Sequence, residues 1–134
     1  MVEAAEVEEG TGGTEVWSYS QGTGELTAPD GVMLACGYSG CGVCTNQPQM
    51  QWAEDLGPIP RGSYAIGVPR DDETMGPYCL PLEPDPENEM HGRFGFYMHG
   101  DNETSTASTG CIIMPRAIRE EVARSTCTTL RVVV

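Results

Sequence analysis

The sequence contains no lysine, and its seven basic residues are all arginines. They face 20 aspartates and glutamates, which leaves a formal net charge of −13. A protein that binds a polyanion needs a basic face to neutralise phosphates, and here the long-range field repels them. We therefore expect no nucleic-acid partner.

The sequence also lacks the segments that lead into or across a membrane. No apolar run approaches the roughly 20 residues that span a bilayer. The first residues, 1–9, are acidic where a secretory signal would be basic and then apolar. We expect neither membrane insertion nor an N-terminal Sec signal.

Aromatic residues are few, at 7%, whereas glycine (17 residues) and proline (10 residues) are abundant. With 39% apolar residues, the chain is too hydrophobic for disorder and too rich in turn formers for a helical bundle. Its 134 residues suit one domain. We expect an acidic, glycine-rich arm over residues 1–13 and a single domain over residues 14–134.

Short alternating or apolar segments between turn residues predict a mostly β domain, a sandwich or a barrel. Residues 22–24 are typical of a hairpin turn. One short helix is expected near the C-terminus, at residues 115–123, with Pro115 in its first turn. Long loops are expected at residues 37–60 and 83–90. The expected strands or buried apolar segments are 14–20, 25–27, 32–36, 62–68, 78–82, 95–99, 111–114 and 130–134.

Six cysteines in so short a chain favour an oxidising compartment or a metal site. We expect Cys111 to stay reduced and at least one disulfide to form among the other five. The alternative is a zinc site with Cys36, Cys41 and Cys44 as three ligands and Cys79, Cys127 or His91 as the fourth, although strong zinc signatures have two closely spaced pairs and this chain has one. The five cysteines are Cys36, Cys41, Cys44, Cys79 and Cys127.

Two residues could perform nucleophilic chemistry together. His99 ends an apolar strand and precedes Gly100, and twelve positions later Cys111 follows Gly110. A cysteine nucleophile needs a nearby imidazole, a group that orients the far ring nitrogen, and amide donors for an oxyanion. The alternative is a buried cysteine and a histidine that never meet.

The segment Phe96–Asp101, followed by Ala107–Ile112, resembles the active-site signature of L,D-transpeptidase (YkuD-like) domains. The likeness is greatest to the type VI secretion L,D-transpeptidase effectors. Similar landmarks occur in order upstream, so the resemblance runs from about Trp17 to Val132. The upstream landmarks are residues 17–21, 37–40, 46–48, 57–64 and 92–96.

This resemblance implies a compact β fold with Cys111 as nucleophile and His99 as its base. It also implies that the Gly100 carbonyl orients the imidazole and that amides near Gly110 and Cys111 form the oxyanion hole. We expect no cofactor and no metal. Two positions depart from widespread transpeptidases, which have His where this chain has Thr109 and Asn where it has Ile113.

Substrate binding is expected at residues flanking this signature. Arg116 follows the nucleophile on the helix and could receive a carboxylate as a bidentate pair. For Arg119 we expect instead a surface ion pair with Glu120 or Glu121. The remaining expected substrate-binding residues are Tyr38, Asp101, Ser108 and Thr109.

The resemblance further implies action on peptidoglycan stem peptides at the bond between diaminopimelate and D-alanine, through a thioester on the cysteine. Transfer to water, to a second stem or to a free D-amino acid would follow. The expected setting is delivery to the periplasm or cell wall as an antibacterial effector, with a secretion apparatus or an immunity protein as partner. The alternative is an inactive wall-binding or virion-associated structural domain, part of an extracellular particle.

Overall fold

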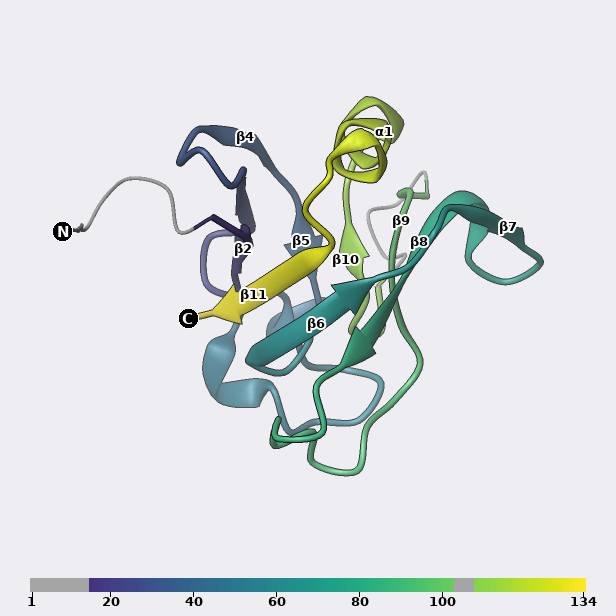
Figure 1. Ribbon diagram of the computed structural model, residues 1–134. Helices are drawn as coiled ribbons and strands as arrows, with labels where there is room; N and C mark the ends of the chain where they lie inside the picture. Colours follow the sequence, from purple (N-terminus) through teal and green to yellow (C-terminus); the bar gives the residue numbers. More distant parts are fainter. Residues whose placement is uncertain (1–14, 103–107) are drawn as a thin grey trace, which may run out of the picture.

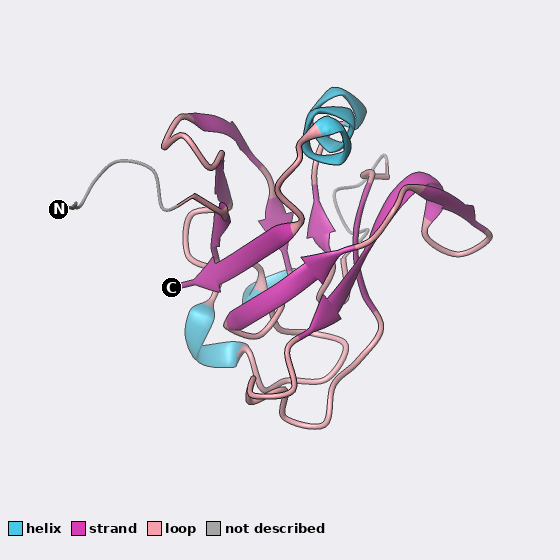
Figure 2. Cartoon of the chain, in the orientation of Figure 1, coloured by secondary structure: helices cyan, strands magenta, loops and turns pink. Residues whose placement is uncertain are grey.

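The computed structural model describes residues 15–102 and 108–134, so the whole of the expected N-terminal arm, residues 1–13, lies outside the described residues. Strands dominate the described part, and one α-helix lies across the top of the view (Figures 1 and 2). The prediction of a mostly β, barrel-like fold with one helix is confirmed. The elements are β2 (Trp17–Ser20), β3 (Glu25–Thr27), β4 (Met33–Cys36), β5 (Tyr38–Ser39), η1 (Gly42–Cys44), η2 (Pro48–Met50), β6 (Gly62–Ile66), β7 (Arg70–Asp72), β8 (Gly76–Pro84), β9 (Phe96–His99), β10 (Ile112–Ile113), α1 (Arg116–Arg124) and β11 (Thr129–Val133).

The strands form one sheet in the order β4-β3-β2-β11-β6-β8-β9-β10-β5, with β7 paired to β8 outside this path. The two ends of this order, β4 and β5, are consecutive in the chain and are joined by Gly37 alone. The Gly37 amide donates to the Gly24 carbonyl at 2.7 Å. A Cβ on Gly37 would lie 1.9 Å from the Ile113 carbonyl oxygen. Glycine thus lets the chain pass between the two edges and nearly close the sheet.

Alternating side chains explain the central strands. Trp17 and Tyr19 of β2, and Leu130 and Val132 of β11, are buried, whereas their neighbours along each strand are half-buried or exposed. A period of two places one side of each strand in the core. β2 and β11 pair in parallel, with Trp17 beside Leu130, so the first and last described strands meet in the middle of the sheet.

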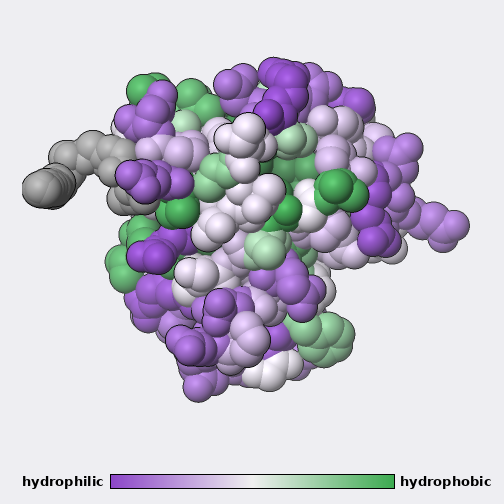
Figure 3. All heavy atoms as spheres, in the orientation of Figure 1, coloured by the Kyte–Doolittle hydropathy of each residue, from purple (hydrophilic) through white to green (hydrophobic). Residues whose placement is uncertain are grey.

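The helix α1 covers part of the sheet near β8 and β9, above the strands in Figure 1. It buries Val122 in the core and, unusually, the guanidinium-bearing side chain of Arg119. On the face seen in Figure 3, hydrophilic residues cover much of the surface and apolar residues emerge in separate small groups. No helix in the described ranges is long and apolar enough to cross a membrane.

Three expectations about local structure need correction. The segment 37–60 is not loop throughout, since it contains β5 and two short 3-10 helices. The expected loop at 83–90 begins later, because β8 continues to Pro84 and pairs with β6. The hairpin strand β7 was not anticipated, because its sequence Arg70–Asp72 is charged and has no apolar alternation.

The expected disulfide is absent, since all six cysteines are free thiols. Five of them contact different backbone carbonyls or amides. The Cys36 Sγ, for example, lies 2.9 Å from the Thr23 carbonyl, and the Cys79 Sγ lies 3.2 Å from that of Arg70. Within residues 15–102 and 108–134, no three His, Cys, Asp or Glu side chains converge to hold a metal ion. The zinc alternative therefore has no support in the described part.

Candidate active site

Cys111 is held against the backbone of the neighbouring strand β9. The Tyr97 amide donates to the Cys111 Sγ at 3.3 Å, and the sulfur also lies 4.0 Å from the Gly95 carbonyl. Only 4% of the residue is exposed. This burial raises the pKa of Cys111 to about 11, although the Tyr97 amide acts in the opposite direction. The resting thiol is thus protonated at neutral pH.

His99 lies two residues beyond Tyr97 on the same strand, a rise of about 6.6 Å along β9. It is buried, and its Nδ1 lies 2.9 Å from the Gly100 carbonyl oxygen. Because a carbonyl only accepts, Nδ1 carries the hydrogen and Nε2 is left with a lone pair. Burial lowers the pKa of His99; the Gly100 contact raises it, while the charges of Arg119 and Asp101 lower and raise it respectively. Neutral imidazole is therefore favoured.

The register of the sheet places Cys111 on the segment next to β9, two positions before the level of His99. β10 runs parallel to β9, with Ile112 beside Met98 and Ile113 beside His99. Cys111 precedes Ile112 and meets β9 one step earlier, at Tyr97. The nucleophile expected from sequence thus lies directly before β10, and the expected base ends the adjacent parallel strand β9.

Two buried serines, Ser108 and Ser39, hold the loop of residues 108–111 through hydrogen bonds. The Ser108 hydroxyl donates to the Cys111 carbonyl at 2.6 Å and accepts from the amides of Gly110 and Gly40 at 3.0 and 2.9 Å. The Ser39 hydroxyl donates to the Gly110 carbonyl at 2.8 Å. Ser108 is completely buried, whereas its neighbour Thr109 is exposed. Ser108 therefore lies under the loop, and Thr109 lies on its surface.

Arg93 holds the same loop from the other side. Its Nη2 donates to the carbonyls of Thr109 and Gly57 at 3.2 and 3.0 Å, and Nη1 donates to those of Pro58, at 2.9 Å, and Gln51. The side chain is 6% exposed, and burial lowers its pKa. No carboxylate forms an ion pair with it among the described residues. Arg93 thus anchors residues 51–58 to the nucleophile loop through neutral oxygens.

Gly110 is required by this packing. Its φ is +139°, and a Cβ there would lie 2.5 Å from the Arg93 Nη2 and 2.9 Å from the Phe96 ring. A side chain at this position would therefore displace both the guanidinium and the aromatic ring. Glycine is the residue that lets the backbone before Cys111 lie directly on Arg93.

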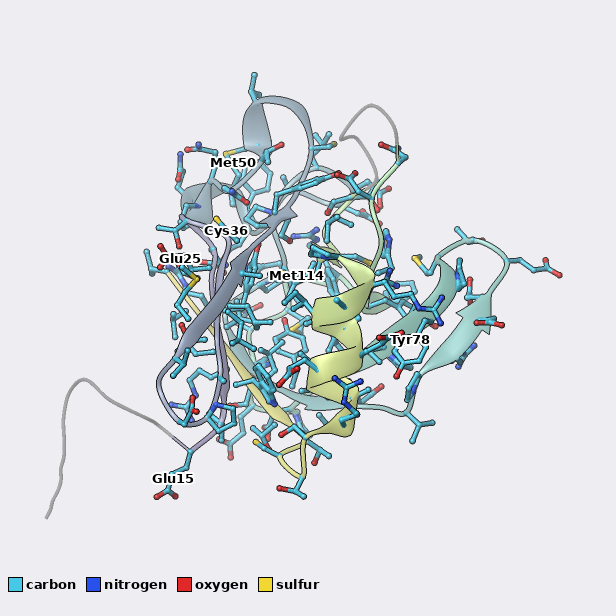
Figure 4. All side chains as sticks on the ribbon, turned by 90° about the horizontal axis from the view of Figure 1, so that it is seen from above. Glu15, Glu25, Cys36, Met50, Tyr78 and Met114 are labelled. Carbon is cyan, nitrogen blue, oxygen red and sulfur yellow. The ribbon has the colours of Figure 1, made fainter. Side chains whose placement is uncertain are left out.

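Two hollows flank the pair. Cys111 and Thr109 line a cleft of about 170 Å³ together with Glu54, Asp55 and Phe94. A second hollow of about 480 Å³, the helix-side groove, lies beside the start of α1. Figure 4 shows Met114 just before this helix, with Cys36 to one side. Both residues line the helix-side groove. Its polar lining residues are Tyr38, Asp101, Arg116 and Arg119.

Two of the three arginines of α1, Arg116 and Arg119, have different environments from those expected. Arg119 forms no surface ion pair, and that expectation is wrong. It is 5% exposed and donates to the carbonyls of Met114, Pro77 and Tyr78 at 3.1, 3.0 and 2.8 Å. Arg116 instead makes the ion pair, to Glu120 at 3.1 Å, and stacks over the Tyr78 ring at 4.7 Å. The i,i+4 spacing of Arg116 and Glu120 was a signal for this pair.

Of the residues expected at the site, the structure gathers Tyr38, Asp101 and Arg116 around the groove and Thr109 at the cleft. The Tyr38 hydroxyl donates to the Asp101 carboxylate at 2.6 Å. Sequence reasoning assigned no role to Ser39 or Arg93, and it expected Arg119 on the surface. The segment containing Arg93 was noted only as a landmark, and nothing in it indicated which carbonyls the guanidinium would meet.

The comparisons with known proteins agree with this architecture. No curated protein matches the chain at the level searched. The family model of the Tlde1 domain matches residues 34–134, which include β4 to β11, both hollows and every residue of the nucleophile loop. The matched part is three quarters of the chain, and the chain therefore belongs to the Tlde1 family, the type VI secretion L,D-transpeptidase effector domains.

Proposed function

We propose that residues 14–134 form the catalytic domain of an enzyme that modifies peptidoglycan stem peptides through a thioester on Cys111. The family supports an enzyme that acts on peptidoglycan as a type VI effector. The observation that supports the cysteine mechanism is the joint position of Cys111 and His99. Both are buried, Cys111 directly before β10 and His99 at the end of the adjacent parallel strand β9, and the imidazole presents Nε2 because Nδ1 is bound to the Gly100 carbonyl.

The reaction begins with a neutral thiol and a neutral imidazole. The His99 Nε2 takes the proton from Cys111 as the sulfur attacks the carbonyl of diaminopimelate in a tetrapeptide stem. The amide of Cys111 stabilises the oxyanion, because the neighbouring Gly110 amide already donates to Ser108. The C–N bond to the terminal D-alanine breaks, and the imidazolium returns its proton to the leaving amine. Water or an amine then attacks the thioester, and Cys111 is released.

The raised pKa of the thiol makes the base essential. A thiol with a pKa of about 11 is almost wholly protonated at neutral pH, so attack requires proton removal in the same step. His99 suits this task because its lowered pKa keeps the imidazole unprotonated. Substrate choice depends on segment 37–60, which supplies the walls of both hollows, and on the groove beside α1.

Delivery to the periplasm or cell wall, with a secretion apparatus or an immunity protein as partner, follows from the family as part of this proposal. The reaction is tested with purified, reduced protein and a disaccharide-tetrapeptide, with and without D-methionine, followed by mass spectrometry. We expect loss of the terminal alanine or its exchange for methionine. Cys111→Ala and His99→Ala should abolish both products, whereas Cys41→Ala, which changes another partly buried thiol, should retain them. Intact tetrapeptide beside reduced wild-type protein would favour the inactive wall-binding domain.

A further inference from the structure

The helix-side groove contains two groups of opposite charge that no contact with the described residues neutralises. It lies next to the proposed base, because Gly100 and Ile113 line it and both adjoin His99. Arg119 and Asp101, its two charged residues nearest His99, shift the pKa of that imidazole in opposite directions. A ligand in this groove would therefore lie beside the reacting centre.

The cation is Arg119, and only part of its guanidinium is satisfied. Nε donates to the Met114 carbonyl, and Nη1 donates to those of Pro77 and Tyr78. Nη2 has no hydrogen-bond acceptor within residues 15–102 and 108–134. It lies 3.0 Å from the point where a Cβ on Gly100 would stand, so the missing side chain leaves it room. The guanidinium is thus fixed by its buried edge, and its remaining N–H donors adjoin the groove.

The other arginine of the groove does not offer a free charge. Arg116 is paired with Glu120 and stacked on Tyr78, and its side chain is 54% exposed. Arg119 is by contrast 5% exposed and has no carboxylate partner in the described residues. An incoming carboxylate would gain more from Arg119, because water screens a buried charge less than an exposed one.

The anion is Asp101. Its Oδ1 accepts from the Tyr38 hydroxyl at 2.6 Å and from the Asn102 amide at 2.8 Å. Oδ2 accepts no hydrogen bond from the described residues. The carboxylate is therefore held in one orientation by Tyr38, with an oxygen left for a donor from a ligand.

We propose that the helix-side groove binds the zwitterionic centre of an α-amino acid, with its carboxylate on Arg119 Nη2 and its ammonium on Asp101 Oδ2. A simple anion would meet Asp101, and a simple cation would meet Arg119, so the groove selects a group that has both charges. Within the proposed function this centre has two sources. One is a free amino acid that accepts the acyl group, and the other is the side-chain end of diaminopimelate in the stem.

Binding is tested by NMR titration of the reduced wild-type protein with D-alanine, N-acetyl-D-alanine and D-alanine amide. We expect D-alanine to bind at least about tenfold more tightly than either blocked form, the effect of losing one charge-assisted hydrogen bond. Arg119→Gln should remove the preference over D-alanine amide, and Asp101→Asn should remove the preference over N-acetyl-D-alanine. Arg124→Gln, which changes an exposed arginine on the same helix, should keep both preferences. Asp101→Asn retains an acceptor for Tyr38, so it tests the groove even if Arg119→Gln unfolds.

A second titration separates the two sources. A stem tripeptide ending in diaminopimelate is compared with one ending in lysine, whose side chain has the ammonium but no carboxylate. A preference for the diaminopimelate stem that disappears in Arg119→Gln, together with weaker binding of both stems to Asp101→Asn, assigns the groove to the donor, and binding of D-alanine assigns it to the acceptor. The proposal is overturned if neither ligand shows a preference that depends on Asp101 or Arg119. Cys111→Ala should bind these ligands like the wild type. If the wild-type protein binds them but shows no turnover, the proposed reaction is contradicted and the groove assignment stands.

Discussion

The backbone amide of Tyr97 donates a hydrogen bond to the Sγ of Cys111 over 3.3 Å. This contact places the sulfur at the edge of β9, where the burial that raises its pKa to about 11 also limits access from solvent. The sulfur therefore remains a protonated thiol beside the strand that contains His99. Its reactivity should appear only when a substrate carbonyl and the base act on it together.

The rate of alkylation by iodoacetamide tests whether the resting Cys111 is protonated. At pH 7 we expect the exposed Cys36 to react well before Cys111, whose raised pKa reduces its thiolate fraction by about a hundredfold relative to an ordinary thiol. Peptide mapping over time gives the rate at each cysteine. The Cys111 rate should rise with pH up to about 11. A Cys111 that is modified first at pH 7 would contradict the protonated resting state.

The pH profile of kcat/KM should show the lowered pKa of His99. The base must be neutral to accept the thiol proton, and a lowered pKa keeps it neutral to a lower pH. Activity should therefore persist as the pH falls and be lost only below about 6.5, the ordinary pKa of histidine. His91→Gln changes the other histidine, which is exposed, and should leave the profile unaltered. An acid limb centred above 6.5 would argue against His99 as the base.

Ser108→Ala should both destabilise the protein and reduce its activity. The substitution leaves two buried amides and one buried carbonyl without their partner, at a cost of about 2 kcal/mol in the free energy of unfolding. Urea denaturation measures this cost. Thr109→Ala alters the exposed neighbour and should change stability by less than about 0.5 kcal/mol. Equal stability of the two variants would mean that Ser108 does not support the loop.

Much of the fold could be predicted from the sequence, because the signals are local. Alternation in 17–20 and 62–66, the turn at 22–24 and the proline before the helix each act within a few residues. The sheet order could not be predicted, because it depends on pairs such as Trp17 with Leu130 that no local pattern specifies. β7 was not predicted because its charged residues have no strand pattern of their own and form a strand by pairing with β8.

The site was predictable to a similar degree. The signature indicated Cys111 and His99, but the residues that support them satisfy carbonyls and amides from distant segments. Arg93 meets Gly57 and Thr109, and Ser108 meets Gly40, contacts that exist only after the chain has folded. A buried arginine bound to neutral oxygens has no sequence pattern of its own.

Arg93→Met tests that support directly. Methionine fills a similar space but leaves four carbonyls without their donor, and we expect a loss of about 3 kcal/mol in the free energy of unfolding. Activity should fall at temperatures where the variant is still folded, because residues 51–58 are no longer tied to the nucleophile loop. Arg61→Met, at an exposed arginine, is the matched control and should change neither property. A stable, active Arg93→Met protein would refute this role.

Gly37→Ala should be among the most destabilising single-methyl substitutions in the chain. The added Cβ would overlap the Ile113 carbonyl oxygen at 1.9 Å, so the two edges of the sheet must separate, at about 3 kcal/mol or more. Gly22→Ala adds the same methyl where the nearest atom is 3.6 Å away and should be tolerated. Thermal unfolding of both variants measures the difference. Similar melting temperatures would mean that the seam at Gly37 is not closed in solution.

The position of β11 has a consequence for how the active protein comes into being. This strand, residues 129–133, lies between β2 and β6 in the middle of the sheet, although it is the last of the described strands in chain order. Until β11 has formed, no strand links β2 to β6, and the series of paired strands from β2 to β9 is interrupted. Pairings of such long sequence separation form slowly. We therefore expect the proposed catalytic centre to form only after residues 129–133 have joined the sheet, and deletion of this strand to remove the proposed activity.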